Sequence, residues 1–383
     1  FVMLEGNPLY QCFSDLDDPR AKTHSSRHLL PDIMMLTILA VLCGADGWVD
    51  VESFGKAKYT WLKTFLKFPH GVPSHDTIGA FFSKLDPTQL QKCFLKWVNE
   101  LFKFTGGDII AIDGKTLRGA YDRASNKPAI HMVSAWACKN QLVLGQVKTK
   151  EKSNEITAIP ELLKTLALKG NIVTIDAMGC QKKIAEQIIV QEGDYILNLK
   201  GNHPKLYKNV SSFFSDYFDG KKMMNTRIDE YGNTHKNHGR IETRRYYVSN
   251  NIDLLPNIKE WPGLKSIGMV VYESIEKATS EIKLERRYFI SSLNTNAKTF
   301  SEAIRMHWGI ENGLHWCLDV AFNEDACRIR KDYASENLAV VRHIALNLLK
   351  KEKTAKTGIK NKRLNAGWDN AYLARLLETD QTD

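Results

Sequence analysis

Two short apolar segments of this sequence each lead to a single aspartate and then to a turn that contains glycine. The first is GDIIAIDGKT at residues 107–116, with Asp113 as its acid, and the second is NIVTIDAMG at residues 171–179, with Asp176. Four to eight apolar or β-branched residues in a row, bounded by glycine, predict a strand buried on both faces. An acid at the carboxyl end of such a strand is costly to desolvate without a positive partner. Two acids in this position therefore suggest a shared cation.

Both aspartates also have an ordinary structural explanation. Asp113 precedes a glycine, and Asp-Gly pairs favour turns, while Asp176 could cap the loop that follows it. We weigh these explanations against the shared cation and prefer the cation for both acids.

The helical segment after residue 299 offers a third acid. Its residues at every third or fourth position form one stripe along a helix. The stripe consists of Ile304, Trp308, Glu311, His315, Leu318 and Phe322. A carboxylate such as Glu311 is costly on an inward face unless charged partners lie there. Asp319, Glu324 and Asp325 follow closely, so the residues alone leave the third acid open. We interpret His315 as a hydrogen-bonded core residue and not as a metal ligand.

Carboxylates from separate elements suit phosphoryl transfer that depends on a hard divalent cation. Mg²⁺, with Mn²⁺ as a substitute, takes oxygen ligands and keeps waters for catalysis. Two ions about 3.5–4 Å apart can activate the attacking oxygen and stabilise the leaving oxygen. We expect Asp113 to bridge two ions, with Asp176 and Glu311 each holding one. The nucleophile would be water for strand cleavage or a DNA 3′-hydroxyl for strand joining.

The elements that must position these acids follow the order β-β-β-α-β-α-β. The expected strands are 108–113, 131–137, 142–148, a strand ending at Asp176, and 195–199, and the two helices lie near 153–168 and 181–191. A hairpin-linked trio followed by α/β crossovers predicts a mixed sheet. Its first and fourth strands can lie side by side, which brings Asp113 and Asp176 within range of one ion. This order is the ribonuclease-H-like arrangement.

The fold class expected for the whole chain is therefore α/β (α+β), with a mixed sheet in the core and additional helices outside it. Residues 1–104 have helical patterns and predict an N-terminal helical domain. Residues 105–350 would form the ribonuclease-H-like catalytic domain, interrupted at about 201–295 by a β-rich insertion with alternating stretches at 244–248, 267–272 and 282–290. Residues 351–383 are expected to be a basic C-terminal tail.

Composition narrows the class of protein. A net charge of +9 favours a polyanionic partner, because Lys and Arg displace counterions from phosphates. There is no run of eighteen apolar residues, so we expect no membrane span. The seven cysteines never have Cys-x-x-Cys spacing, which argues against a zinc ribbon and predicts thiols in a reducing cytoplasm.

Several basic or amide side chains near the expected site are candidates for DNA contact, although each could simply be solvated. These candidates are Lys115, Arg118, Lys200, Asn202, Arg240, Arg328 and Arg330. Arg328 and Arg330 have a second option, which is to pair with Glu324 and Asp325.

At these residues the chain resembles a bacterial insertion-sequence transposase of the DDE type, in the branch that includes the H-repeat-associated proteins. The matching segments, in the family's order, are LCGADGW (42–48), PSHDT (73–77), AIDGKTLR (111–118), IDAMG (175–179), YILNLKGN (195–202), HGRIE (238–242) and HWGIENGLHWCLDV (307–320). The resemblance implies that Asp113, Asp176 and Glu311 are the metal-binding triad, which raises Glu311 above its neighbours. It also implies a core interrupted by a β insertion and double-stranded DNA of element ends as substrate.

One departure from the wider group concerns the residues around the glutamate. Related transposases carry Tyr-x-x-Arg-x-x-x-Glu-x-x-x-x-x-x-Lys, whereas Ile304, His307 and Leu318 stand here in place of the Tyr, Arg and Lys. Those three DNA contacts are not carried over, and the route of excision, through a hairpin or not, is left open.

Three rival functions are weighed. A haloacid-dehalogenase-like phosphatase needs a second Asp two residues from the first, but Ala111 and Lys115 occupy both positions. A transposase-derived DNA-binding protein without cleavage activity and a ribonuclease-H-like nuclease stay as alternatives. For the transposase we expect a homodimer on DNA, since two distant ends are cut together, and a bacterial cytoplasmic location with nucleoid association when DNA is bound.

Overall fold

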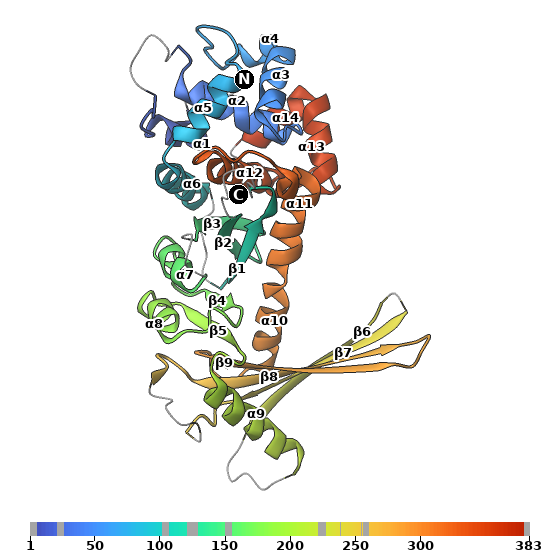
Figure 1. Ribbon diagram of the computed structural model, residues 1–383. Coiled ribbons are helices and arrows are strands. Elements are labelled where there is room, and N and C mark those ends of the chain that lie inside the picture. The colour runs from blue at the N-terminus through green and yellow to red at the C-terminus, as the bar shows by residue number, and fades with distance from the viewer. Residues whose placement is uncertain are drawn as a thin grey trace.

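A nine-stranded mixed sheet runs through the described part of the chain (Figure 1). The computed structural model describes residues 6–20, 27–101, 107–120, 129–149, 155–220, 227–237, 239–253, 255 and 260–378. The strand order is β3-β2-β1-β4-β5-β9-β8-β7-β6. The strands are β1 (Ile109–Leu117), β2 (Ile130–Ala137), β3 (Leu142–Lys148), β4 (Ile172–Ile175), β5 (Asp194–Leu199), β6 (Ile228–Asn237), β7 (Arg240–Ser249), β8 (Ser266–Glu276) and β9 (Ile282–Ser291).

The first five strands form the expected ribonuclease-H-like arrangement. β1 pairs antiparallel with β2, and β2 with β3, while β4 is parallel to both β1 and β5. Helices α7 (Glu155–Leu163) and α8 (Lys182–Val190) cover one face of this half, and α10 (Ala297–His307) runs along the other (Figure 1). Because both faces are covered, the central strands are apolar runs that do not alternate with polar residues. The predicted fold class is confirmed.

Strand β1 is longer than the sequence predicts, because the chain does not turn at Asp113. Asp113 and Gly114 both pair with β2, and the strand continues to Leu117. Gly114 fits here for a steric reason, since a Cβ atom at this position would overlap the side chains of Glu155 and His131. The glycine thus permits close packing within the sheet.

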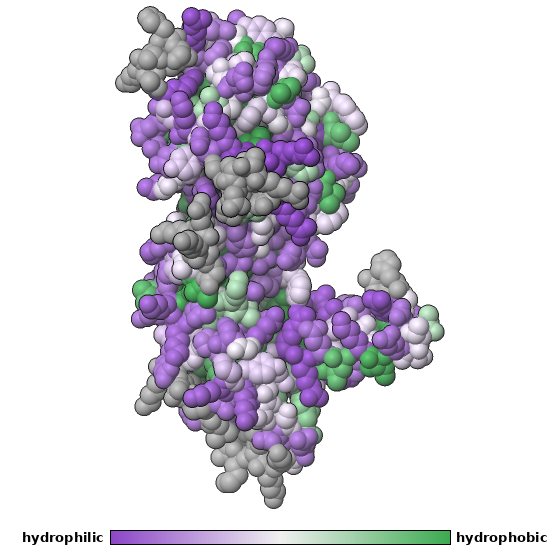
Figure 2. Space-filling view, viewed as in Figure 1, coloured by the Kyte–Doolittle hydropathy of each residue, from purple (hydrophilic) through white to green (hydrophobic). Residues whose placement is uncertain are grey.

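The predicted insertion extends the same sheet. Helix α9 (Pro204–Phe218) precedes β6–β9, and β9 pairs antiparallel with β5, so the four inserted strands continue the core sheet outward. We call β6–β9 the arm, because its distal part stands away from the body of the molecule (Figures 1 and 2). The prediction did not include α9 or β6.

The remaining helices surround the far end of the sheet. They are α1 (Pro8–Ser14), α2 (Leu30–Leu42), α3 (Trp48–Ala57), α4 (Tyr59–Leu62), α5 (His75–Lys84), α6 (Pro87–Leu101), α11 (Trp316–Phe322), α12 (Ala334–Lys351), α13 (Ile359–Trp368) and α14 (Asn370–Leu377). The buried α12 packs against α2, α5 and α6 and also against β3. One hydrophobic core therefore joins the N-terminal helices to the sheet.

The segment expected as a basic tail forms packed helices instead. Arg363 of α13 is buried, and its guanidinium donates hydrogen bonds to the carbonyl oxygens of Val41 and Ala45. Asn7, which caps α1, donates to the carbonyl of Leu377 at 2.7 Å. Both ends of the described chain thus belong to one helical layer. In the part of the chain that the structure describes, no helix has both the length and the hydropathy to cross a membrane.

Candidate active site

The β1–β4 register brings the two aspartates to the same place in the sheet. Ile112 of β1 is the partner of Ile175 of β4, so Asp113 and Asp176 are the next residues on adjacent parallel strands. Both aspartates line one cavity of about 270 Å³. The parallel pairing that the sequence predicted thus brings both acids to one cavity.

The turn after β4 holds Asp176 through its own backbone. Asp176 Oδ1 accepts a hydrogen bond from the Met178 N–H at 3.0 Å. The Asp176 side chain therefore caps the loop that follows it and also lines the cavity. Asn202, expected to contact DNA, donates its Nδ2 hydrogen to the Ala177 carbonyl at 2.6 Å. Its amide therefore fixes the turn that carries Asp176.

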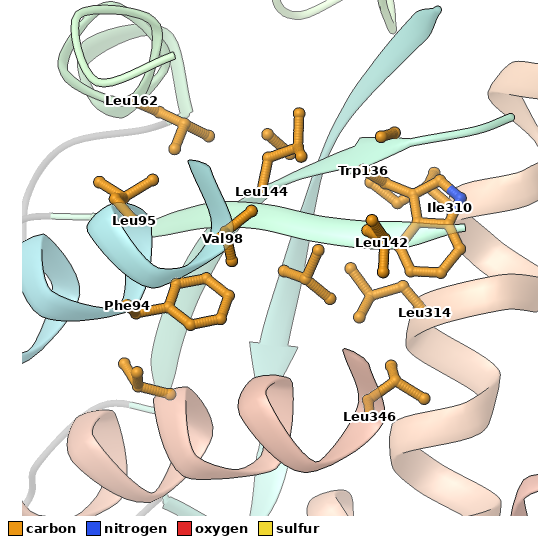
Figure 3. Close-up of a cluster of buried hydrophobic side chains, with 14 of the residues drawn as sticks. Phe94, Leu95, Val98, Trp136, Leu142, Leu144, Leu162, Ile310, Leu314 and Leu346 are labelled. Atoms are coloured by element: carbon orange, nitrogen blue, oxygen red, sulfur yellow. The ribbon is translucent and has the colours of Figure 1, made fainter. Parts of the chain in front are cut away.

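Glu311 lines the same cavity. It opens a π-helical turn, Glu311–His315, between α10 and α11. The neighbours Ile310 and Leu314 are buried in a cluster with Trp136 and other apolar side chains (Figure 3). This packing fixes the turn and leaves the Glu311 side chain 54% exposed. Single π turns inside α-helices are rare, and those that occur are often found at functional sites.

His315 lies between two of the acids. Its Nδ1 is 3.5 Å from Asp113 Oδ2 and 3.5 Å from Glu311 Oε2. One donor atom from each of these three residues lies within 4.8 Å of the other two. Asp176 is outside this close group, although it faces the same cavity from the end of β4.

The electrostatics of the cavity are those of crowded carboxylates. Burial raises the pKa of Asp113 to about 8, and the nearby charges of Glu311 and Asp176 add to the rise. His307, on the last turn of α10, lines the cavity with its Nδ1 3.0 Å from Thr174 Oγ1. Burial lowers the pKa of His307, so this ring does not supply a dependable positive charge. Lys200 and Arg287 also line this cavity and supply its fixed positive charges.

Lys115 lies elsewhere than expected. Its side chain is only 11% exposed, and its ammonium forms ion pairs with Asp319 and with Glu324, the latter at 2.9 Å. Arg342 of α12 adds a second positive charge 3.7 Å from Glu324. These pairs neutralise two of the acids that competed with Glu311 for the third position, and they hold the Lys115 side chain in the protein interior.

The other predicted DNA contacts are spread over the surface. Lys200 lines the acidic cavity, and Arg118 is 83% exposed with its Nε 3.7 Å from Asp325. Arg328 is exposed, whereas Arg330 donates from Nε to the Gly119 carbonyl at 2.9 Å. Arg240 begins β7 beside the outer turn of the arm. The structure does not gather these residues into one cluster, and their DNA contacts stay predictions.

A second cavity, of about 510 Å³, adjoins the acidic one and was missed from the sequence. Arg287 lies over the ring of Trp308 at 5.2 Å, and Arg244 lies over Tyr272 at 4.8 Å. Arg287 and Trp308 line both cavities. The available signal was the alternation of Arg and aromatic residues in 244–248 and 285–289, but only pairing across the arm brings them together.

Comparison with known proteins bears on the whole chain. The family described as "Transposase DDE domain" matches residues 104–348, and the family described as "DDE_Tnp_1-associated" matches residues 10–98. The "H repeat-associated putative transposase YhhI" of Escherichia coli K12 is 44% identical over 377 residues, which are 98% of each chain. The "Putative transposase YncI" of Escherichia coli O157:H7 is 44% identical over 353 residues, covering 92% of this chain and 90% of that protein.

Among solved structures, the piggyBac transposase synaptic complex with hairpin DNA is similar with a TM-score of 0.44 and 12% identity. The match covers 100% of this chain and 84% of that chain.

Proposed function

This chain belongs to the transposase DDE family, and from that premise we propose that it cuts the ends of an insertion element and joins them to target DNA. The observation that carries the proposal is the convergence of Asp113, Asp176 and Glu311, from β1, the end of β4 and the π turn, on one cavity. Acids that are 63 and 135 positions apart in the chain have no structural need to meet there.

The residues of the cavity fit a hard divalent cation. Carboxylate oxygens are the ligands that Mg²⁺ and Mn²⁺ prefer. Burial raises the pKa of Asp113 and the nearby charge of Glu311 adds to the rise, and a cation would stabilise the ionised form of Asp113 against both effects. We propose that Asp113, Asp176 and Glu311 would hold two such ions. When bound, the ions supply Lewis-acid activation of water and stabilise negative charge at the phosphate.

Both proposed reactions are in-line displacements at phosphorus. In cleavage, the oxygen of water bonds to the phosphorus at the element end, the bond from phosphorus to the 3′-oxygen breaks, and a free 3′-hydroxyl results. In joining, that 3′-oxygen bonds to a phosphorus of the target and displaces the target's own 3′-oxygen. Neither reaction needs a covalent link to the enzyme.

The chain's own residues would bind and orient the DNA around these steps. Lys200 and Arg287 line the acidic cavity, where a positive charge favours a scissile phosphate. We propose that Arg118, Arg240, Arg328 and Arg330 contact DNA further out. The buried ion pairs of Lys115 and the loop contact of Asn202 support structural roles for those two residues.

The assembly and location follow from the same proposal. Two element ends must be cut and joined together, so we propose that the protein acts as a homodimer on double-stranded DNA in the bacterial cytoplasm, associated with the nucleoid. The mass of the purified complex with element-end DNA tests this, because a single copy per pair of ends would contradict it.

The decisive assay supplies DNA that carries the flanks of the gene, together with Mg²⁺ or Mn²⁺. Wild type should nick the ends and then yield strand-transfer products. Asp113→Ala, Asp176→Ala and Glu311→Ala should each lose cleavage by at least about 10³-fold while they keep their circular dichroism spectrum and DNA affinity. DNA binding without nicking by wild type would favour a transposase-derived DNA-binding protein, and nicking without joining would favour a nuclease.

A further inference from the structure

The side chain of His315 has a position that a core histidine does not require. It is 8% exposed and sits on the π turn that begins with Glu311, one turn further along the helix. Its Nδ1 is 3.5 Å from a carboxylate oxygen of Asp113 and 3.5 Å from one of Glu311. Both distances exceed the roughly 2.7–3.2 Å of an N–H···O hydrogen bond.

The spacing of these three donors suits a common metal ligand sphere. Donors about 2.1 Å from one ion are about 3.0 Å apart when they subtend a right angle, and further apart at wider angles. The nitrogen–oxygen distances of 3.5 Å lie within this range. The two distances from His315 Nδ1 thus suit one ion, and all three donor atoms lie within 4.8 Å of one another.

The ring is aimed at the acids by packing and not by a second hydrogen bond. His315 Nε2 is buried and has no hydrogen-bond partner within the described residues. Leu314 and Leu318 on either side are buried, which fixes the helix at this point. Since no hydrogen donor holds Nε2 among the described residues, this nitrogen can carry the ring hydrogen and leave the lone pair of Nδ1 for an ion.

We propose that His315 Nδ1 is an additional ligand of the divalent ion held by Asp113 and Glu311, which gives this ion one nitrogen and several oxygen donors. The inference rests on the proposed function, because the ion is the one assigned to catalysis there. A nitrogen donor shifts preference away from Mg²⁺, which favours oxygen, toward Mn²⁺ and later transition ions. The site would therefore select among metals by means of a residue outside the three acids.

His307 provides a matched comparison. It lines the same cavity and lies one helical turn before Glu311, but its Nδ1 is engaged with Thr174 Oγ1 at 3.0 Å. It is also absent from the close group of donors. Because neither ring nitrogen of His307 belongs to that group, a direct metal bond is expected from His315 and not from His307.

The experiment is pulsed electron paramagnetic resonance of the full chain loaded with Mn²⁺. Nitrogen bonded directly to Mn²⁺ modulates the electron spin echo. Wild type should show ¹⁴N modulation that becomes ¹⁵N modulation when the protein is made with ¹⁵N-histidine. His315→Gln should abolish it and weaken Mn²⁺ binding by about tenfold or more, while His307→Gln should retain it. The labelled wild type gives an answer even if one variant fails to fold.

The outcomes separate this inference from the proposed function. Bound Mn²⁺ with no histidine modulation, or modulation that persists in His315→Gln, would overturn the nitrogen ligand and leave the three-acid site standing. If Mn²⁺ does not bind to wild type at all, both the ligand assignment and the proposed function fail.

Discussion

At the scale of single residues, Lys115 links the candidate site to the helices behind it. It follows Asp113 by two positions, and its ammonium pairs with Asp319 on α11 and with the fully buried Glu324. Lys115→Met should destabilise the protein by about 3–5 kcal/mol, because it leaves the buried carboxylate of Glu324 without its closest positive partner. Urea unfolding followed by circular dichroism measures this change.

The control for that variant is an exposed arginine nearby. Arg118 is 83% exposed and lies 3.7 Å from Asp325, so Arg118→Met should cost less than about 1 kcal/mol. Equal stability of the two variants would show that the Lys115 pairs contribute no more than a surface contact.

Asp113 gives the metal-free protein a pH dependence of defined sign. Burial and the charge of Glu311 raise its pKa to about 8, so between about pH 4 and pH 8 the folded chain binds a proton that the unfolded chain has lost. The free energy of unfolding therefore falls as pH rises through this range. Asp113→Asn removes the penalty and should be the more stable protein at pH 8, by roughly 1–3 kcal/mol.

Chemical denaturation in EDTA at pH 5 and pH 8 tests the sign. The advantage of Asp113→Asn should grow between the two pH values, and saturating Mn²⁺ should restore the wild type at pH 8. An advantage of the same size at both pH values would mean that Asp113 titrates normally.

A functional residue could be predicted from the sequence where its position depends on the local pattern, and could not where it depends on partners from distant elements. Asp113 and Asp176 follow apolar runs whose burial is a local property, so the pattern sufficed to find them. Glu311 could not be separated from Asp319 and Glu324 by pattern, because their partners Lys115 and Arg342 come from other elements. Only the family resemblance decided between them.

At the scale of elements, the π turn aims Glu311, and two glycines show how tightly it is packed. A Cβ atom at Gly313 would lie 2.8 Å from Trp136 Cζ2, whereas one at Gly309 would meet Trp136 only at 3.8 Å. Gly313→Ala should push the turn away from β2, destabilise the protein by about 1–3 kcal/mol and reduce cleavage. Gly309→Ala should be neutral or stabilising by up to about 1 kcal/mol.

Thermal unfolding and the cleavage assay on both variants check this pair. If Gly313→Ala cleaves as well as Gly309→Ala, the position of Glu311 does not depend on contact between the π turn and Trp136.

Helices and strands could be predicted from the sequence where a clear apolar run was bounded by glycine. The strands and helices of 105–200 matched in order, because their apolar runs and glycine boundaries are strong. Strand β6 was missed since its sequence, IDEYGNTHKN, has few β-branched residues and gains its place by pairing with β7. The end of β1 was misplaced because Gly114 was taken as a turn, whereas the neighbouring Glu155 side chain explains the glycine.

At the scale of the whole molecule, both ends of the described chain build one helical layer around α12. The segment 351–383 looked like a basic tail, but Lys362 and Arg363 are buried and satisfied by carbonyl oxygens. Charge composition alone cannot reveal this, because two acceptors of Arg363, the carbonyl oxygens of Val41 and Ala45, lie more than 300 residues away in the chain.

A truncation tests this layer. Removal of residues 352–383 deletes α13 and α14 and exposes the apolar surface that they cover, so the product should aggregate or lose helical signal. Removal of residues 379–383 alone leaves both helices in place and should behave as the full chain does. Size-exclusion chromatography with circular dichroism compares them, and a monodisperse, helical 1–351 fragment would contradict the shared layer.

The proposed DNA cleavage and joining require that three acids distant in the sequence share divalent metal. Anomalous X-ray diffraction from crystals of the full chain soaked in Mn²⁺ tests this most directly. We predict an anomalous peak within about 2.5 Å of carboxylate oxygens of Asp113 and Glu311, and a second peak that involves Asp176. Bound Mn²⁺ found only elsewhere on the molecule, with this cavity empty, would contradict it.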